Sequence, residues 1–436
     1  LLIRSFFLLE TQIIMKKLAL LFLLISNSIS SQTWQPITSI PSNSSASGQR
    51  FDDVFFLNEN LGWAANGYYS AVYKTIDGGV NWTLQTTGAM LGSSHYFRNI
   101  EFLDENIGFL GTINQKVYKT TDGGTTWTLI TNITPNPLAI CGLDCVGTST
   151  IYGCGAYFSP AYIIKSTDSG NTWQYINMSA YANTLVEINF IDENIGFASG
   201  NNATGGVILK TTDGGITWTQ LLNTGTNGDY VWKLQFLNSN NNILFGSIEA
   251  ASPNPGRLAK SIDGGLTWTL TNAPETEVQA VGFLDENHGW MGGHNTGFYE
   301  TLNGGVTWTN TGVGSNLNRI FFVGNTAYAS GTTIYKMSSI LSNSDFVEHN
   351  RINLNVKVSP NPVSDKLNIE IDFLAEDHIL IDLYDNNGKI VKNLTKDDIN
   401  SAGIKKYTFD FPYPSGTYFI DFHNNTGRQS SKIIKK

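Results

Sequence analysis

Short apolar runs alternate with polar turns along almost the whole chain, and no long stretch places apolar residues at helical spacing. In residues 102–109 (FLDENIGF) an acidic turn separates two apolar segments. Related phrases occur at 56–63, 190–197 and 283–290, and residues 145–152 take the same place without the acidic turn. Each phrase predicts two short strands joined by a tight turn, so we expect an all-β protein.

A second phrase recurs between such strands. Residues 75–82 (TIDGGVNW) return, with small changes, at 120–127, 166–173, 211–218, 261–268 and 301–308. Each copy lies between two short strands, which predicts a hairpin turn in which Gly-Gly permits positive φ. We expect its polar residue to accept hydrogen bonds from backbone N–H groups two and three residues further on. These residues are Asp77, Asp122, Asp168, Asp213, Asp263 and, in the last copy, Asn303.

The spacing of these positions predicts the architecture. Successive separations of 45, 46, 45, 50 and 40 residues match one four-stranded blade of a β-propeller. Residues 319–323 and 334–336 begin a seventh blade, and residues 33–37 (TWQPI) resemble the strand that follows each repeat. The N-terminal strand is therefore predicted to complete the last blade and close a seven-bladed ring. The alternative is an unclosed or six-bladed ring.

These motifs carry a family resemblance. The pattern S/T-x-D-x-G-x-x-W resembles the Asp-box, or bacterial neuraminidase (BNR) repeat. With its Gly-Gly and Lys-Thr-Thr phrases, the chain is most similar to the propellers of photosystem II stability and assembly factors and their non-photosynthetic relatives. The resemblance covers residues 33–338 and implies a fold far more specifically than a function. A scaffolding role is one function that it implies.

The tail has a different character. Residues 358–364 (VSPNPVS) precede an alternating strand at 366–371, and the chain ends in KIIKK. This order closely resembles the type A C-terminal sorting domain of the Bacteroidetes type IX secretion system. That resemblance implies a small Ig-like β-sandwich at 354–436, passage through the outer membrane, and the type IX secretion machinery as a partner. An ordinary Ig-like module is the alternative.

The N-terminal region predicts export. Met15, Lys16 and Lys17 precede a short apolar run at 18–25 and small polar residues at 26–31. The apolar run is shorter than the roughly 20 residues needed to span a bilayer, so 15–31 is predicted to be a signal peptide, with an N-terminal anchor as the alternative. Residues 1–14 are interpreted as a misplaced start. The remaining divisions are a propeller at 32–338, a linker at 339–353 and an extracellular or outer-membrane-surface location.

Composition narrows the partners. The net charge is -9, the pI is near 5.2, and no block of basic residues occurs, which argues against binding nucleic acid. Cys141, Cys145 and Cys154 leave one thiol over if a local disulfide forms, and their spacing matches no strong zinc pattern. No cofactor, metal ion or membrane-spanning segment is expected.

The innermost strands supply the candidate binding residues. Polar or aromatic residues stand just ahead of their apolar centres and are expected to reach the central channel from one face. A protein or glycan ligand there would contact Arg98, Glu187, Trp232, Lys233 and Arg319, with Tyr96 and Tyr230 as further stacking surfaces. A solvated channel mouth without a partner is the alternative.

Two classes of enzyme share this repeat, and each needs particular residues. A sialidase needs an arginine cluster, and the propeller contains only Arg50, Arg98, Arg257 and Arg319. A xyloglucan-cleaving hydrolase needs two facing acids, for which Asp52 or Asp53 with Asp229 or Glu187 are the candidates. The prediction is a secreted, non-catalytic binding or scaffolding propeller, with an extracellular glycoside hydrolase as the alternative.

Overall fold

The computed structural model describes residues 33–44, 49–92, 95–155, 160–237, 240–324, 326–337, 355–373, 377–385, 390–399, 401–423 and 428–436. Every regular element in these ranges is a β-strand. The chain divides into two compact units, one spanning Gln32–Ile340 and the other containing Leu341–Lys436. The predicted misplaced start, signal peptide and linker lie outside the described residues and stay predictions. Within the described ranges, no helix is long and apolar enough to cross a membrane.

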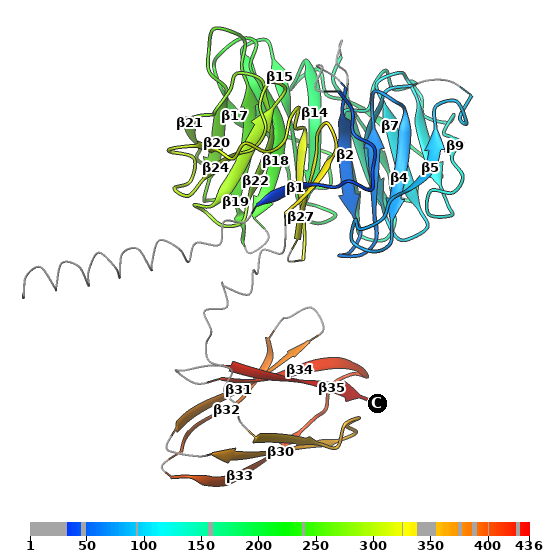
Figure 1. Ribbon diagram of the computed structural model, residues 1–436. Coiled ribbons are helices and arrows are strands. Elements are labelled where there is room, and N and C mark those ends of the chain that lie inside the picture. Colours follow the sequence, from blue (N-terminus) through cyan, green and yellow to red (C-terminus); the bar gives the residue numbers. More distant parts are fainter. Residues whose placement is uncertain are drawn as a thin grey trace, which may run out of the picture. The chain divides into compact units, whose positions relative to one another are not determined.

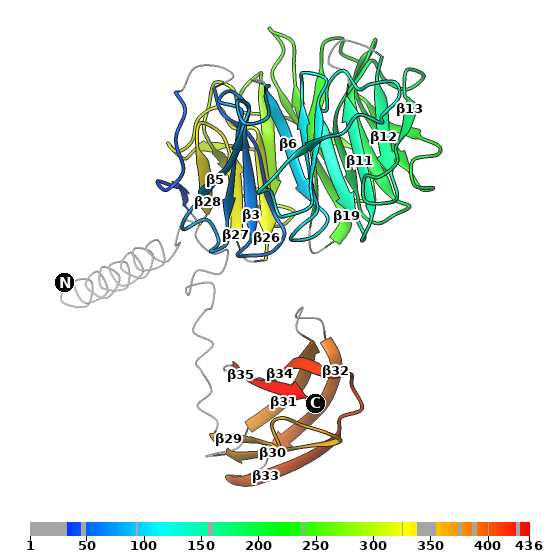
Figure 2. The same ribbon diagram turned by 90° about the vertical axis from the view of Figure 1, so that its right-hand side faces the viewer.

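Seven four-stranded antiparallel sheets make up the first unit, and Figures 1 and 2 show the strands of each blade side by side. The first three blades contain β2 (Phe51–Phe56), β3 (Gly62–Asn66), β4 (Ala71–Thr75) and β5 (Thr83–Thr87); β6 (Phe97–Phe102), β7 (Gly108–Thr112), β8 (Val117–Thr120) and β9 (Thr128–Leu129); and β10 (Gly142–Val146), β11 (Thr150–Gly155), β12 (Tyr162–Ser166) and β13 (Gln174–Asn177). The next three contain β14 (Thr184–Phe190), β15 (Gly196–Asn202), β16 (Gly205–Thr211) and β17 (Thr219–Asn223); β18 (Tyr230–Leu237), β19 (Asn240–Glu249), β20 (Arg257–Ser261) and β21 (Thr269–Asn272); and β22 (Val278–Phe283), β23 (Gly289–Gly293), β24 (Tyr299–Thr301) and β25 (Thr309–Asn310).

The seventh blade joins the two ends of the propeller. It contains β26 (Arg319–Val323), β27 (Thr326–Ser330), β28 (Ile334–Met337) and the N-terminal strand β1 (Trp34–Pro36), which pairs with β28. The seven inner strands β2, β6, β10, β14, β18, β22 and β26 contact one another in a full circle. The predicted seven-bladed closed ring is therefore confirmed, and the six-bladed or unclosed alternative is wrong. Trp34 anchors the closing strand, since its buried ring stacks on Phe298 at a centroid distance of 4.2 Å.

The Asp-box turns join the third and fourth strands of blades 1 to 6. In blade 2, the Thr120 hydroxyl accepts from the Gly124 amide at 2.9 Å and donates to Asp122 at 2.8 Å. Asp122 accepts from the Thr126 amide, four residues on, at 2.8 Å. The expectation is therefore correct only in part. The amide two residues on bonds the Thr120 hydroxyl instead of the carboxylate. The carboxylate reaches the amide of the fourth residue and, at Asp168 and Asp213, also that of the third.

The second unit contains two sheets. One orders β29 (Asn355–Ser359), β30 (Lys366–Phe373) and β33 (Gly403–Asp410); the other orders β32 (Ile390–Ile399), β31 (Asp377–Asp385), β34 (Gly416–His423) and β35 (Arg428–Lys435). Along β30 the apolar residues are buried and the residues between them are more exposed. Ile369 and Ile371 from this strand share one core with Ile381 and Phe422 from the other sheet. The unit is thus the small β-sandwich that the tail sequence predicted.

Candidate functional site

The inner strands of the blades present two equivalent rows of side chains around the channel. The register with the second strand aligns Asp53 with Ala65, Glu187 with Ser199 and Ala280 with Gly292. The first row is Asp53, Asn99, Gly142, Glu187, Lys233, Ala280 and Arg319; the second, two residues further along each strand, is Phe55, Glu101, Asp144, Asn189, Gln235, Gly282 and Phe321. Residues two apart on a strand share a face, so both rows are directed toward the same side of their blades.

Several of these polar side chains bind the backbone of the next blade. An inner strand is the edge of its sheet, so the backbone groups that point away from the second strand need hydrogen-bond partners from elsewhere. Asp53 accepts from the Ile100 amide at 2.9 Å, and Asp144 accepts from the Phe190 amide at 2.6 Å. Gln235 bonds both backbone groups of Phe283, at 2.6 and 2.8 Å. Much of the polarity of the channel therefore serves to satisfy sheet edges.

The remaining charges form ion pairs within the ring. Arg319 donates to Asp53 at 2.8 Å and to Glu101 at 3.1 Å. Lys233 Nζ lies 2.5 Å from Glu187 Oε2, and the Asn189 amide donates to the other Glu187 oxygen at 3.1 Å. All of these groups are largely buried, so removing either partner of a pair leaves a desolvated charge.

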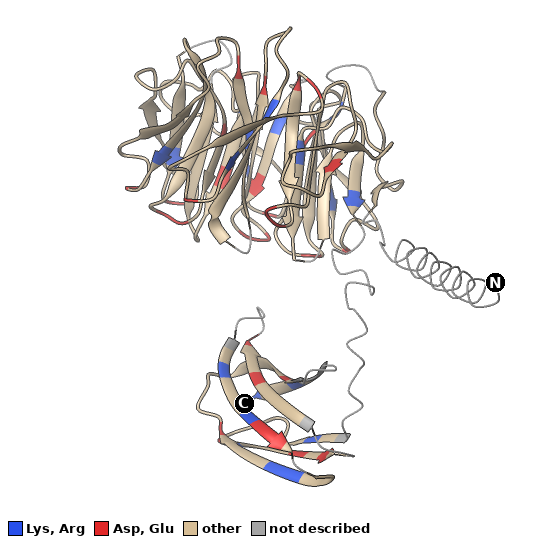
Figure 3. Ribbon diagram, turned by 90° about the vertical axis from the view of Figure 1, so that its left-hand side faces the viewer, with Lys and Arg blue, Asp and Glu red and all other residues tan. Residues whose placement is uncertain are grey.

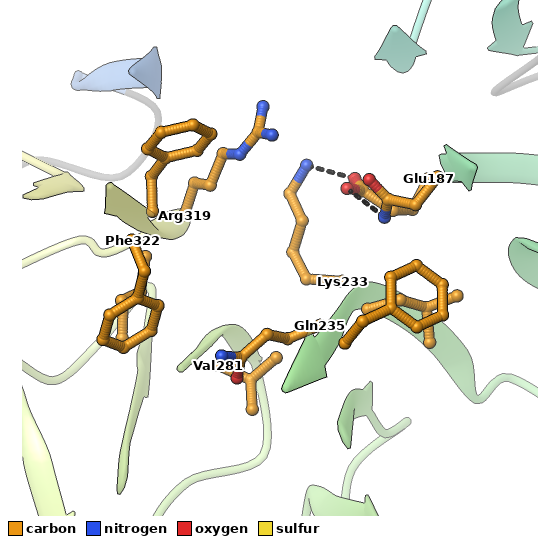
Figure 4. A pocket seen from close by; sticks show the side chains of 11 residues that line it. Glu187, Lys233, Gln235, Val281, Arg319 and Phe322 are labelled. Carbon is orange, nitrogen blue, oxygen red and sulfur yellow. Dashed lines mark hydrogen bonds and ion pairs between the residues drawn. The ribbon is translucent and has the colours of Figure 1, made fainter. Parts of the chain in front are cut away.

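A cavity of about 180 Å³ opens between these groups. Figure 4 shows Arg319 and Lys233 extending toward the same space, with Glu187 beside Lys233. The rest of the lining comes from blades 4 to 7: Asn189, Leu234, Gln235, Phe236, Val281, Ile320, Phe321 and Phe322. Three of the five predicted binding residues, Glu187, Lys233 and Arg319, thus meet in one cavity.

The other two predicted residues lie at the channel mouth, one residue ahead of the first row. Arg98 pairs with Asp52, which also accepts from Arg50 at 3.2 Å. The Arg98 guanidinium lies over the Trp232 ring, 5.4 Å from its centroid. Trp232 is 7% exposed and donates to Asn318 at 3.2 Å. The structure therefore packs the ring of Trp232 and leaves it little open face for a sugar.

The four acids proposed for hydrolysis are all held in ion pairs. Asp52 pairs with two arginines, Asp53 with Arg319, Asp229 with Arg257 and Glu187 with Lys233. Each carboxylate is buried, and the cations are buried or, for Arg257 and Arg319, partly buried, as expected of structural pairs.

Sequence reasoning missed two acids of the second row. Burial raises the pKa of Asp144 to about 7 and that of Glu101 well above its usual value. The alternation of side chains along a strand could have identified them, because Glu101 lies two residues after Asn99 and therefore on the same face of the blade. Neither acid lines the cavity.

The Asp-box residues lie apart from this site, on turns at the ends of the blades. Asp and Glu recur on turns along the lower edge of the propeller in Figure 3. Hydrogen bonds from neighbouring hydroxyl and amide groups lower the pKa of Asp168, Asp213 and Asp263 to about 2. Asn303 makes the equivalent bond to the Thr307 amide at 2.9 Å. The geometry matches the predicted role of turn former.

Among the residues that the structure describes, no group of three or more His, Cys, Asp or Glu side chains is arranged to hold a metal ion. Cys145 and Cys154 are present as thiols, and Cys141 and Cys154 are buried.

Comparison with known proteins defines the tail and the fold. Residues 357–436 match the family described as the secretion system C-terminal sorting domain. No curated protein sequence is significantly similar to the chain.

Among solved structures, YCF48 bound to D1 peptide is similar at a TM-score of 0.54 and 19% identity, covering 71% of this chain and 98% of that chain. YCF48 from Cyanidioschyzon merolae has a TM-score of 0.54 and 17% identity, covering 70% and 98%. PorZ, a surface component of the type IX secretion system of Porphyromonas gingivalis, has a TM-score of 0.52 and 13% identity, covering 89% of this chain and 59% of that chain. At these identities the likeness shows a shared fold. The chain thus combines an Asp-box propeller with a type IX sorting domain.

Proposed function

We propose that this protein, once secreted by the type IX system, acts as a non-catalytic recognition module that receives one group of a partner in its central channel. The sorting domain implies secretion to the cell surface or the extracellular space. The observation that carries the proposal is the cavity into which Lys233, Glu187 and Arg319 project, enclosed by a closed ring of seven blades.

The size of the cavity favours a small group. Pockets for drug-sized ligands measure roughly 300–1,000 Å³. A cavity of about 180 Å³ has the volume of about six water molecules. One side chain or chain end of a polypeptide fits this space. Because the lining residues stand on strands of a closed ring, little ordering is needed when the group enters.

A hydrolase is a weaker fit to the same geometry. Glycosidic acids need to face each other across roughly 5–10 Å of substrate space. The acids of the channel are in ion pairs or, like Glu101 and Asp144, lie outside the lining of the cavity. The YCF48 structure bound to a peptide supports a polypeptide partner, since it has the same fold.

A binding screen tests the proposal. The full chain is applied to peptide and glycan arrays, and every positive is assayed for reducing-sugar release. We expect peptide binding without sugar release, and a loss of at least tenfold in affinity for the double variant Glu187→Gln/Lys233→Met, which removes the ion pair without leaving a buried charge.

The matched control is Lys119→Met. Lys119 donates to Asn171 on an exposed turn, away from the cavity, so its loss should leave the affinity unchanged. Sugar release that disappears on mutating Glu101 or Asp144 would overturn the non-catalytic proposal. Binding that is equally strong in the double variant would move the site away from the cavity.

A further inference from the structure

Exposed aliphatic side chains are concentrated on the Asp-box turns. Each turn exposes two positions, the residue just before the Asp or Asn and the residue just after the last glycine of the motif. Seven of these positions are aliphatic and 62–79% exposed, and we call them the apolar arc: Ile76, Val80, Ile216, Ile262, Leu266, Leu302 and Val306. Among the described residues, Met90, at 67%, is the one other large hydrophobic side chain that is as exposed.

The fold does not require the apolar arc. Blade 2 has Thr121 and Thr125 at the two exposed positions, and blade 3 has Thr167 and Asn171. The turns of these two blades still make the hydroxyl-to-amide bond of the motif, at 2.9 Å in both. Single exposed apolar residues are ordinary on a protein surface, whereas a group of them marks a site of interaction.

The turns that carry the apolar arc lie on neighbouring blades. Lys210 of blade 4 donates to the Gly264 carbonyl in the Asp-box turn of blade 5 at 3.2 Å. Lys260 of blade 5 donates to the Glu286 carbonyl, in a turn of blade 6, at 2.7 Å. Blade 7, which follows blade 6 and precedes blade 1, has no Asp-box turn. The apolar arc therefore extends over blades 4, 5, 6 and 1, and the polar turns belong to blades 2 and 3.

The exposed charges beside the apolar arc are acidic. The turn between the first two strands of a blade lies against its Asp-box turn, since the Gly78 amide donates to the Asn60 carbonyl at 2.9 Å. In blades 1, 4 and 6 these turns expose five carboxylates: Glu59, Asp192, Glu193, Asp285 and Glu286. Figure 3 shows Asp and Glu on turns along this edge of the propeller. The lysines nearby are partly buried and donate to backbone carbonyls: Lys74, Lys210 and Lys260.

We infer that the apolar arc binds a polypeptide segment that carries both basic and apolar side chains. The apolar side chains of the segment cover the aliphatic residues, and its Lys or Arg side chains meet the carboxylates of blades 1, 4 and 6. The same carboxylates repel an anionic membrane, and a second copy of this face would bring carboxylate against carboxylate. The inference is independent of the channel, because no residue of the apolar arc lines the cavity.

Three synthetic peptides of equal length test the chemistry of the partner. One consists of Lys and Leu, one of Glu and Leu, and one of Lys and Ser, and fluorescence anisotropy follows their binding to the full chain. We expect the Lys/Leu peptide to bind at least tenfold more tightly than either of the others, with an affinity that falls as the ionic strength rises. Equal affinity for the Lys/Leu peptide and either of the other two would overturn the inference.

A variant that borrows the residues of blade 2 tests the position. Ile262→Thr/Leu266→Thr/Leu302→Thr/Val306→Thr places threonine at both exposed positions of blades 5 and 6, as blade 2 has naturally. We therefore expect the melting temperature to be retained and the affinity for the Lys/Leu peptide to fall at least tenfold. An unchanged affinity in this folded variant would overturn the inference.

The matched control removes exposed apolar side chains that lie outside the Asp-box turns. Tyr68→Thr/Met90→Thr/Ile113→Thr/Leu138→Thr makes the same number of substitutions, at side chains that are 41–67% exposed. This variant should keep the affinity for the Lys/Leu peptide within threefold. An equal loss in both variants would show that the peptide binds exposed apolar surface without preference for the arc, which would overturn the inference.

Two further measurements distinguish the other occupants. We expect the wild-type chain to sediment as a monomer and to bind neither phosphatidylcholine vesicles nor vesicles that also contain phosphatidylglycerol. A dimer, or vesicle binding, that is lost in the variant of blades 5 and 6 would assign the apolar arc to a second copy or to a membrane and overturn the inference. The channel variant Glu187→Gln/Lys233→Met should bind the Lys/Leu peptide as the wild type does, so failure of the proposed channel function leaves this inference intact.

Discussion

The Asp-box turns and the channel rows use the same repeat in opposite ways. The six Asp-box turns repeat one hydrogen bond. In every copy a Thr or Ser hydroxyl accepts a hydrogen bond from a glycine amide at 2.8–2.9 Å. In the first channel row, the residue type changes from blade to blade, from acidic and basic side chains to an amide, an alanine and a glycine. The repeated bonds are those that every blade needs in order to fold. The positions that vary are free to specify a ligand.

A lysine on the third strand of several blades, and its replacement in blade 6, support this distinction. Lys74, Lys165 and Lys210 each donate to a glycine carbonyl in the Asp-box turn of the next blade, at 3.0, 2.7 and 3.2 Å. Blade 6 has Glu300 at this position, paired with His288 at 2.9 Å. The blade that follows it is closed by β1 and has no Asp-box turn to receive a lysine. The lysine is absent where its acceptor is absent.

The largest effect is expected from the channel ion pair. Lys233→Met leaves Glu187 buried without its cation, which costs about 3–5 kcal/mol of unfolding free energy. Adding Glu187→Gln should restore most of that loss. Chemical denaturation followed by tryptophan fluorescence measures both variants. A single variant that loses less than the double variant would show that the pair is not desolvated in solution.

The pH dependence of the free energy of unfolding should have opposite signs for the Asp-box turns and for the channel. Asp168, Asp213 and Asp263 have a pKa lowered to about 2, so their contribution is present above pH 4 and is lost as the pH falls toward 2. Asp144 has a pKa raised to about 7, so the fold favours its neutral form and loses stability as the pH rises from 4 to 7. The raised pKa of Asp144 corresponds to a loss of at most about 4 kcal/mol in the free energy of unfolding.

Melting temperatures between pH 2 and 9 test both signs. Asp144→Asn should be more stable than the wild type at pH 8 and should lose much of the slope between pH 4 and 7. Asp213→Asn, which reproduces the natural residue at position 303, should leave that slope unchanged. An Asp144→Asn variant with the wild-type slope would assign the dependence to Glu101 alone.

The sequence predicted the fold closely because the fold depends on local, repeated chemistry. The spacing of the Asp-box residues determined the blade count, and Trp34 identified the closing strand. The candidate site was predicted in part: Glu187, Lys233 and Arg319 meet in the cavity, whereas Trp232 and Arg98 pack at the mouth. Which polar residue bonds an edge amide could not be predicted, because that requires aligning the inner strands across blades and these strands share little sequence.

A smaller effect is expected from one Asp-box hydroxyl. Thr120→Val leaves the buried Gly124 amide without its acceptor at 2.9 Å, which costs about 1–3 kcal/mol. The matched control is Thr121→Val, because Thr121 is adjacent but exposed and should change the free energy of unfolding by less than about 0.5 kcal/mol. Denaturation curves for the two variants give the comparison directly. Equal effects of the two substitutions would mean that the loss of stability comes from placing valine in the turn and not from losing the hydrogen bond between hydroxyl and amide.

The smallest effect is expected from the lysine that links two blades. Lys165 donates to the Gly214 carbonyl at 2.7 Å and lies 5.2 Å from the centroid of the Tyr152 ring. Lys165→Met keeps the apolar stem but loses the bond and the cation–π contact, for a cost of about 1 kcal/mol.

The repeat provides two controls for this variant. Lys119→Met removes only a bond to the exposed Asn171 side chain and should cost less than about 0.5 kcal/mol. Glu300→Lys restores the repeated residue in blade 6 and should bring no gain in melting temperature, because blade 7 has no Asp-box carbonyl to accept from it. A gain there would show that the lysine stabilises its own blade through the aromatic ring, and that the link to the next turn is secondary.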